Sequence, residues 1–358
     1  MGKHTALYTK HLESNASFTL LGDWEVPNHY HSATHEHLAV RQHAGMFDVS
    51  HMTIVDIRGI DAEAYLQKLL ANNVSRLENT GQALYSTMLN NNGGIIDDVI
   101  LYNMGNWYRI ISNGHTRNQS IEWMTAHATG YEISLTERPE LCLIAIQGPK
   151  AISCVKKLYP DAAELIDSLN RFEGKTLSHW FYSRTGYTGE DGLEITLPEE
   201  DAAELWQTLL DAGVVPCGLQ AADSLRIEAG FNFYGKEMSE QESPLTSNMA
   251  HSIAWQPEDR AFLGRDALSA EQARGVDFKL VGLVLPQHAA ASTGQALTDA
   301  ENSGVITSAT YSPSLNTNIA IARVPATTQD KCQVSIDGNL VSATVINLPF
   351  VRNGKKQF

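Results

Sequence analysis

The sequence predicts an α+β region followed by a smaller β domain, and two observations support this. Through residues 1–270, helical and strand-like patterns occur in runs rather than in strict β–α–β alternation, which is typical of mixed sheets. From about residue 275 the segments are short and β-rich without a long helical pattern, which favours a small barrel or sandwich. We therefore expect one region at 1–270 and another at 275–358, joined by the linker-like stretch LSAEQARGVDFK.

In the first half of the larger region, turn residues separate each element from the next. A helix is expected to begin near Ser32 or Thr34 and to end at Gly45, because a hydroxyl side chain suits the first position and glycine the last. The elements expected after it are a turn and a strand (48–51, 53–57), an amphipathic helix (61–73) and three strands (81–90, 93–102 and 107–113).

The second half repeats a similar order before the β-rich end. We expect a strand (141–148), a helix (151–159), a Gly-rich turn followed by a strand (185–198), a second helix (201–213) and a further short helix (221–230). In the helix at 201–213, apolar residues form one stripe and Gly213 follows the last turn. Beyond residue 275, an Asp337-Gly338 pair predicts a tight hairpin between two of the short strands.

Composition and charge exclude several classes of function. The chain has 358 residues, 43% hydrophobic and 19% charged, as in an ordinary globular protein, and it contains no apolar span long enough for a membrane. The first residues lack a signal-peptide core and a myristoylation pattern, so we expect a cytoplasmic protein. A net charge of −15 argues against nucleic acid as a partner. The four cysteines have no metal-binding spacing and are expected to be buried, reduced thiols.

Two adjacent carboxylates, Asp97 and Asp98, lie between a Gly-Gly turn and an apolar run in GGIIDDVILY. Side chains in a strand alternate, so the two should face opposite sides. The expected neighbours of Asp98 on its face are Ile96, Ile100 and Tyr102. One interpretation places both aspartates at the solvated end of the strand. The other places Asp98 in an apolar pocket, where lost hydration raises its pKa and suits it to accept a proton from a weakly basic nitrogen.

The Gly-rich stretch RTGYTGEDGLE, residues 184–194, is a second candidate. Its glycines allow left-handed turns and close backbone approach, but it lacks the lysine of a phosphate-binding loop. Glu190 can only accept hydrogen bonds when ionised, so beside Tyr187 it would suit a ring that carries N–H donors. A surface hairpin turn is the simpler interpretation of the same letters.

A cluster of five histidines raises the question of a metal site; its members are His29, His31, His35, His37 and His43. His31 and His35 have the spacing of one helical turn, but His37 lies on another face and no cysteine or carboxylate set completes a shell. Satisfied or solvated histidines are favoured, and no metal is expected. A Ser-His-Asp hydrolase also lacks support, because no serine occurs in a G-x-S-x-G elbow.

Several long segments resemble one family, in the family's order and along essentially the whole chain. They are EHLAVRQHAGMFDVSHM, ALYSTMLNNNGGIIDDVILY, IAIQGP, TGYTGEDGLEI, PCGL with ADSLRIEAG, LGRDAL and FVRNGK. With these motifs the chain resembles the T-protein of the glycine cleavage system, a tetrahydrofolate-dependent aminomethyltransferase. The resemblance implies an α+β cloverleaf of three subdomains around a folate site, the last being the C-terminal β-barrel.

The resemblance also implies a reaction and a partner. A lipoylated H-protein would present an aminomethyl group, which the enzyme transfers to tetrahydrofolate with release of ammonia. Asp98 matches the catalytic aspartate beside the attacking folate nitrogen. The other positions matched to the folate site are Met52, Tyr85, Asn113, Tyr187, Glu190 and Arg352, with Glu190 on the pterin ring and Arg352 near the anionic glutamate tail.

Two departures from the family pattern leave alternatives open. Ala222 replaces an arginine that family members usually carry in this helix, and Arg226 would substitute only if the helix rotated or the side chain reached back. An arginine usual near the start of the barrel is also missing from QHAAASTGQAL. The alternatives are a paralogous folate-dependent demethylase or one-carbon transferase, and a folate-binding module with little catalysis.

The tail VRNGKKQF is the only locally basic segment of an acidic chain. The H-proteins of this system are typically acidic too, so docking would need a local basic patch. The expected patch consists of Arg352, Lys355 and Lys356, and the protein is expected to be a monomer.

Overall fold

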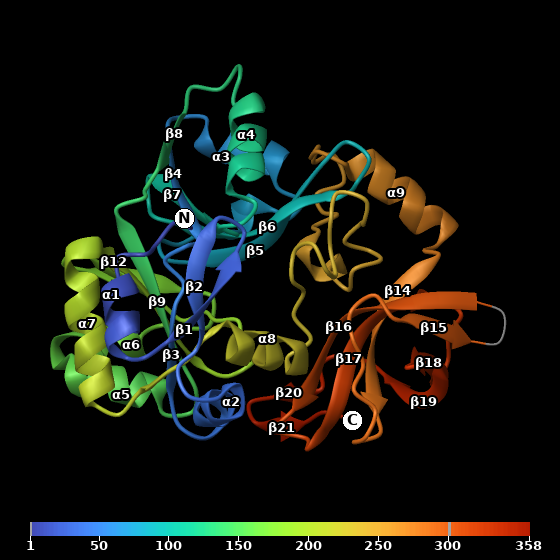
Figure 1. The fold of residues 1–358 in the computed structure, drawn as a ribbon. Coiled ribbons are helices and arrows are strands. Elements are labelled where there is room, and N and C mark those ends of the chain that lie inside the picture. Colours follow the sequence, from blue (N-terminus) through green and yellow to red (C-terminus); the bar gives the residue numbers. More distant parts are fainter. Residues whose placement is uncertain (1, 300–301) are drawn as a thin grey trace.

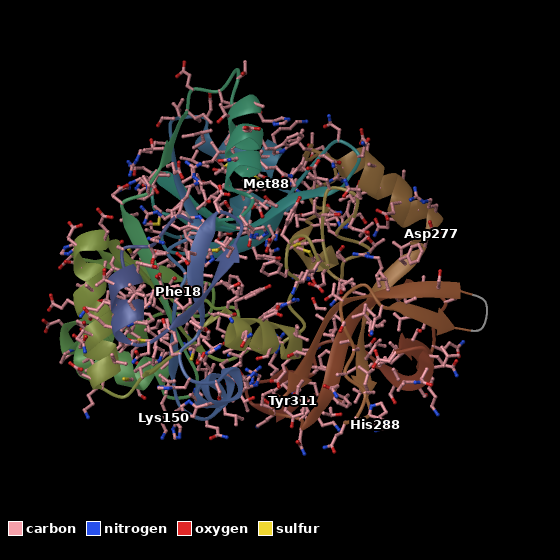
Figure 2. All side chains as sticks on the ribbon, in the orientation of Figure 1. Phe18, Met88, Lys150, Asp277, His288 and Tyr311 are labelled. Atoms are coloured by element: carbon pink, nitrogen blue, oxygen red, sulfur yellow. The ribbon has the colours of Figure 1, made fainter. Side chains whose placement is uncertain are left out.

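A computed structural model describes residues 2–299 and 302–358, which form three parts around a common centre (Figure 1). One part contains a five-stranded sheet, the second a six-stranded sheet and the third a closed barrel. Figure 2 marks a residue in each: Met88 in the first sheet, Lys150 in the second part and Tyr311 in the barrel. This arrangement confirms the predicted α+β fold with a C-terminal barrel.

The first part is an antiparallel sheet with helices on one face. Its strand order is β5-β6-β7-β4-β8, where the bounds are β4 Thr53–Arg58, β5 Ala83–Leu89, β6 Ile95–Asn103, β7 Trp107–Ser112 and β8 Ser134–Glu137. Helices α3 (Ala62–Leu69) and α4 (Arg117–Ala126) pack on it, and the short helix η1 spans Val74–Arg76. Their side chains share one core with Val99 and Leu101 of β6. The opposite face of the sheet packs through Tyr102 and Ile111 against the second part.

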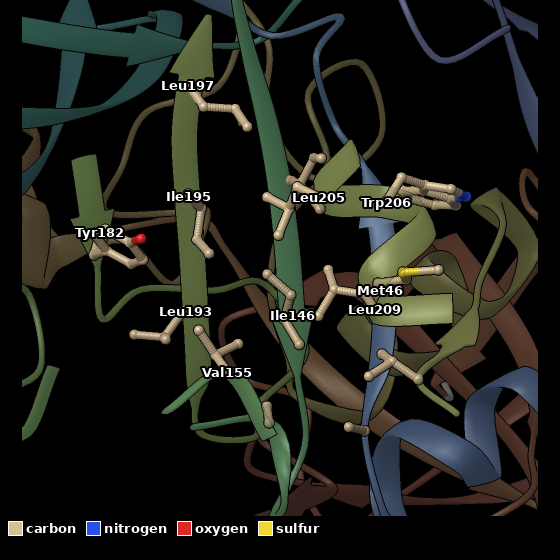
Figure 3. Close-up of a cluster of buried hydrophobic side chains, with 14 of the residues drawn as sticks. Met46, Ile146, Val155, Tyr182, Leu193, Ile195, Leu197, Leu205, Trp206 and Leu209 are labelled. Carbon is tan, nitrogen blue, oxygen red and sulfur yellow. The ribbon is translucent and has the colours of Figure 1, made fainter. Parts of the chain in front are cut away.

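The second part is built from segments on both sides of the first in sequence. Its sheet order is β10-β11-β12-β9-β3-β13, with β3 Gly45–Asp48, β9 Leu141–Gln147, β10 Gly174–Leu177, β11 Trp180–Ser183, β12 Gly192–Pro198 and β13 Val215–Pro216. The helices are α1 Tyr8–Glu13, α5 Ala151–Leu158, η2 Pro160–Ala162, α6 Ala163–Asp167 and α7 Glu199–Asp211. Figure 3 shows Leu205, Trp206 and Leu209 of α7 in its core, on the stripe predicted from sequence.

A hairpin and two helices connect these parts with the barrel. The hairpin consists of β1 (Ser17–Leu21) and β2 (Trp24–His29), and α2 (Ala33–Gln42) follows with Ser32 as its N-cap. Helix α2 ends before the predicted Gly45, which instead begins β3. Helix α8 (Leu219–Glu228) packs against α2, β2 and two barrel strands, so it lies at the junction.

The prediction of a linker at residues 268–279 is wrong, because most of this stretch lies in helix α9, Arg265–Arg274. The preceding residues 229–264 contain little regular structure apart from η3, Ala250–Ser252. Leu268 of α9 is fully buried, yet the rest of the helix is polar. A helix with one buried side chain lacks the apolar stripe that periodicity detects, so its sequence looks like a linker.

The third part is a closed six-stranded barrel, so the sandwich alternative is excluded. Its order is β14-β17-β16-β15-β18-β19, with β14 Phe278–Leu285, β15 Ala296–Asp299, β16 Asn302–Ser312, β17 Thr317–Pro325, β18 Lys331–Ile336 and β19 Asn339–Ile346. Asp337 and Gly338 both have positive φ angles between β18 and β19, as the hairpin prediction requires. A terminal hairpin of β20 (Val351–Arg352) and β21 (Lys355–Lys356) follows the barrel.

In the part of the chain that the structure describes, no helix is long and apolar enough to cross a membrane. Cys142, Cys217 and Cys332 are buried, as expected, whereas Cys154 is only half-buried.

Candidate active site

A β-bulge in β6 sets the directions of the acid pair. Asp98 lies opposite Thr87 of β5 and Asp97 opposite Met88, but the next pair is Ile95 with Leu89, so Ile96 is an extra residue. Ile96 therefore packs with Val99 and Leu101 on the helix-covered face. The strict alternation assumed from sequence is wrong at this residue. Ile100 and Tyr102 do lie together, in the core on the opposite face.

Asp97 is fully buried, which excludes the solvated strand end predicted as one alternative. Its Oδ1 accepts hydrogen bonds from the backbone N–H of Asp98 (2.9 Å) and from Asn113 Nδ2 (2.7 Å). Its Oδ2 accepts from Thr116 Oγ1 (2.8 Å) and Ser120 Oγ (2.5 Å), at the start of α4. The carboxylate is thus held by four donors.

Asp98 is half-buried and has two donors. Tyr85 Oη donates to its Oδ2 at 2.9 Å, and Asn113 Nδ2 donates to its Oδ1 at 2.7 Å. Burial raises the pKa of Asp98, against the opposing effect of these hydrogen bonds. Burial, followed by the charge of Asp98, raises the pKa of Asp97 as well. The pair is therefore a site where a proton can be held and released near neutral pH.

Tyr187 and Phe231 form an aromatic surface near this pair. Their rings stack with centroids 5.6 Å apart at 14°, and the Tyr187 hydroxyl donates to the backbone carbonyl of Asn232. Tyr187 exposes 40% of its surface, yet burial raises its pKa, and its hydroxyl senses the charge of Asp98.

Arg352 lies against the Phe231 ring and has no carboxylate partner in the part of the chain that the structure describes. Its guanidinium carbon is 5.7 Å from the Phe231 ring centroid, and its buried Nε finds no hydrogen-bond acceptor among residues 2–299 and 302–358. The terminal hairpin is anchored there because the N–H of Asn353 donates to the Gly189 carbonyl at 3.0 Å. An unpaired cation on an aromatic surface is suited to an anionic ligand.

Glu190 is held on the Gly-rich turn by two donors to the same oxygen. Arg41 Nη1 and the N–H of Gly354 each donate to its Oε1 at 2.8 Å, and the side chain is 4% exposed. Burial raises the pKa of Glu190, while Arg41 opposes this. Gly189 has φ +81° and a Cβ there would lie 2.8 Å from that of Ala229, so glycine is required beside Glu190. Within the described ranges of the chain, Oε2 of Glu190 accepts no hydrogen bond.

The structure also places Met52, the departure at Ala222 and the arginine considered as its substitute, Arg226. Met52 is half-buried beside the Tyr102 core, on the same face of the sheet as Asp98. Ala222 lines a cavity of about 40 Å³ with His51. Arg226 is fully buried, and its guanidinium donates to Asp223, Glu237, Ser308 and the Phe231 carbonyl. Arg226 is therefore committed to joining α8 with the barrel and does not replace the missing arginine.

The structure thus brings Tyr85, Asp98 and Asn113 together and sets Tyr187 within electrostatic range of Tyr85 and Asp98, while Met52 packs against the Tyr102 core. Glu190 and Arg352 form a second group, joined through the terminal hairpin.

Sequence reasoning missed two aromatic contacts of this site. His251 stacks on Tyr85 with centroids 5.9 Å apart, and His115 stacks on Phe233 at 5.2 Å. Burial lowers the pKa of both histidines. Two of these residues come from the irregular segment 229–264, where no periodicity signals their direction.

The histidines near α2 have different surroundings, and the buried Nδ1 of His29 has no hydrogen-bond partner among the residues that the structure describes. His37 is buried between Ser224 and Ser314, 3.2 Å from Glu228, and the rings of His31 and His35 meet edge to face. No group of three potential ligands converges within the described ranges.

Comparison with known proteins agrees over the whole chain. A model of the GCVT N-terminal domain matches residues 7–257, and one of the glycine cleavage T-protein C-terminal barrel domain matches 279–352. A Chromobacterium violaceum protein named aminomethyltransferase is 47% identical over 357 residues, with 99% of each chain covered. The crystal structure of glycine cleavage system aminomethyltransferase T from Bartonella henselae matches with a TM-score of 0.93 and 30% identity, covering 100% of both chains.

Heterotetrameric sarcosine oxidase from Corynebacterium sp. U-96 also matches, but a TM-score of 0.34 and 13% identity over 51% of this chain carry no argument. The fold and the candidate site define an α+β protein with a buried acid pair and a C-terminal barrel. The two domain models match this division into an N-terminal domain and a barrel domain. The chain belongs to the glycine cleavage T-protein family.

Proposed function

We propose that the chain is the aminomethyltransferase of a glycine cleavage system. It transfers the one-carbon unit of aminomethyl-dihydrolipoyl H-protein to tetrahydrofolate, releases ammonia and leaves the dihydrolipoyl thiol. The similarity to the Chromobacterium and Bartonella proteins supports this reaction and gives no support to the demethylase or the weakly catalytic module. The observation on which the proposal rests is Asp98, a carboxyl of raised pKa held by Tyr85 and Asn113.

In this reaction Asp98 stabilises the positive charge that develops on the attacking amine and accepts its proton. An arylamine nitrogen is a weak base, and positive charge develops on it as it bonds to the aminomethyl carbon. A carboxylate in a site of low hydration stabilises that charge and accepts the proton more strongly than one in water. Tyr85 and Asn113 fix both oxygens of Asp98, so the carboxylate need not reorient during the reaction.

The remaining site residues fit a reduced folate by their chemistry. The stacked Tyr187 and Phe231 offer a flat apolar surface, and Glu190 supplies an acceptor for pterin N–H groups through the oxygen that Arg41 does not engage. Arg352 supplies a cation for the glutamate carboxylates. Met52 completes the apolar side below Asp98.

The basic tail is the proposed contact for the lipoylated H-protein. Lys355 and Lys356 are exposed on the terminal hairpin, three and four residues beyond Arg352, in a chain of net charge −15. A cationic patch at this place would steer an acidic partner toward the same region as Arg352. We further propose that the protein is a cytoplasmic monomer with one region at 1–270 and a second at 275–358.

A single assay tests the reaction. Tetrahydrofolate and aminomethylated H-protein are supplied, and ammonia and methylene-tetrahydrofolate are measured together, with Asp98→Asn as the matched variant. We expect equal amounts of both products from the wild type and a rate lower by about 10²- to 10⁴-fold in the variant. Folate binding without either product in the wild type would overturn the proposal and favour one of the two alternatives.

A further inference from the structure

Asp97 is a fully buried carboxylate that the proposed reaction leaves without a role. Its four donors come from β6, the residue after β7, and the start of α4. No arginine, lysine or histidine of the described chain forms an ion pair with it or with Asp98. A neutral amide side chain would satisfy most of these hydrogen bonds. Because a buried carboxylate without a cationic partner is costly, the choice of an acid at position 97 needs a functional explanation.

One side chain couples Asp97 to Asp98. Asn113 Nδ2 lies 2.7 Å from Oδ1 of Asp97 and 2.7 Å from Oδ1 of Asp98. These two oxygens are therefore at most twice 2.7 Å, or 5.4 Å, apart. Charges at that separation in a partly desolvated site interact strongly enough to change proton affinity by about one to two pH units.

The hydrogen bonds also decide which member of the pair keeps its charge. Each carboxylate has one oxygen held by N–H donors and one held by hydroxyls that can rotate to accept. The number of donors differs: Asp97 accepts from four and Asp98 from two, and hydrogen bonds donated to a carboxylate favour its ionised form. A proton is therefore accommodated more easily on Asp98 than on Asp97.

We propose that Asp97 is a positioning residue: its carboxylate stays ionised when the pair holds a single proton, which strengthens the affinity of Asp98 for that proton, and it holds Asn113 against both. This inference rests on the proposed function, in which Asp98 takes the proton. The titratable groups around the pair are three tyrosines, Tyr85, Tyr187 and Tyr234, which burial keeps neutral in the working range of pH. Behind them lie His251, stacked on Tyr85, and His115, beside Tyr234, and burial lowers the pKa of both histidines and so favours their neutral forms. The groups presented by α4 are neutral hydroxyls.

Asp97→Asn removes the charge while keeping the shape. The amide oxygen can accept from Asp98 and Asn113 as Oδ1 does, and the amide nitrogen can donate to the hydroxyl oxygens of Thr116 and Ser120. Because Asp98 must be ionised to act, kcat/KM rises with pH through its titration. We expect the acid limb of kcat/KM to move about one to two units to lower pH in this variant.

Asp56→Asn is the matched control. Asp56 is a buried carboxylate in the same sheet, but it pairs with Arg109 and Arg138 and not with the site. This variant should lose stability and leave the acid limb in place. An unchanged limb in Asp97→Asn, or an equal shift in both variants, would overturn the proposal.

Infrared titration of the protein without substrates supplies a readout apart from activity. The wild type should show a protonated-carboxyl band from Asp98 that Asp98→Asn lacks and that titrates at lower pH in Asp97→Asn. Bands of other buried carboxyls such as Glu194 are common to all three proteins and cancel in the difference spectra. If Asp97→Asn does not fold, comparison of the wild type with Asp98→Asn still decides, because an Asp98 band that titrates at an ordinary carboxyl pKa overturns the proposal. An inactive wild type whose bands shift as expected would refute the transferase reaction and retain the role of Asp97.

Discussion

Glu228 at the end of α8 offers the sharpest stability test. It is fully buried and accepts from Arg41 Nε at 3.0 Å, from Ser312 Oγ at 2.5 Å and from Ser314 Oγ at 2.8 Å, with His37 Nε2 at 3.2 Å. These contacts join α2 and α8 to barrel strand β16 and the loop after it. Replacement by glutamine keeps the shape and most hydrogen bonds but leaves Arg41 with Glu190 as its only carboxylate partner.

The magnitude follows from the pKa of Glu228. Burial alone would raise it, but His37, Arg41 and Ser312 outweigh burial and lower it from 4.5 to about 2. That difference corresponds to about 3 kcal/mol of stability for the ionised folded state. Because the pKa is lower in the folded than in the unfolded chain, this stabilisation is complete above pH 4.5 and is lost as pH falls toward 2.

Urea unfolding measured between neutral and acidic pH checks this reasoning. Glu228→Gln should be about 3 kcal/mol less stable than the wild type at pH 7, and the gap should narrow as pH falls below about 4.5. Glu194→Gln is the matched control, because burial raises the pKa of Glu194, with only Thr185 opposing it. That variant should lose little or no stability at neutral pH. A wild type and Glu228→Gln with parallel pH profiles would refute the reasoning.

Three further outcomes are expected. Trp206→Ala, which empties the centre of the second core, should lower the free energy of unfolding by about 3 to 5 kcal/mol in urea titrations, and a loss below about 1 kcal/mol would show that the core collapses around it. Neutralising Lys355 and Lys356 together should weaken binding to H-protein and flatten its salt dependence in calorimetry, and unchanged values would remove the tail from the docking surface. Ala222→Arg should tighten tetrahydrofolate binding by about 5- to 100-fold if the usual arginine contacts the ligand, and equal affinities by fluorescence titration would show that this chain does not need it.

The regular helices and strands could be predicted because the burial of one face makes apolar residues recur at a fixed spacing along the sequence. The stripe of α7 with Trp206, the strand run around Asp98 and the Asp337-Gly338 hairpin each follow a rule that acts within about ten residues, and each was found where expected. Helix α9 was missed for the converse reason, since Leu268 alone is buried and a single position has no period.

The candidate site was predictable only where it lies on such elements. Asp98, Tyr85 and Asn113 are on or directly after three adjacent strands of one antiparallel sheet, so their proximity follows once the strands pair. The partners of Glu190 were not predictable, because Arg41 comes from α2 and Gly354 from the terminal hairpin.

By itself, the sequence determined the α+β class, the β-rich end and the family, because these depend on local periodicity and on long ordered motifs. Only the tertiary structure decided which face Ile96 occupies, that Arg226 is committed to the barrel junction, and that Asp97 lies fully buried beside Asp98. A bulge, an ion pair between distant segments and the loss of hydration around a carboxylate all depend on what other parts of the chain bring to the same place, and that information is absent from any short stretch of letters.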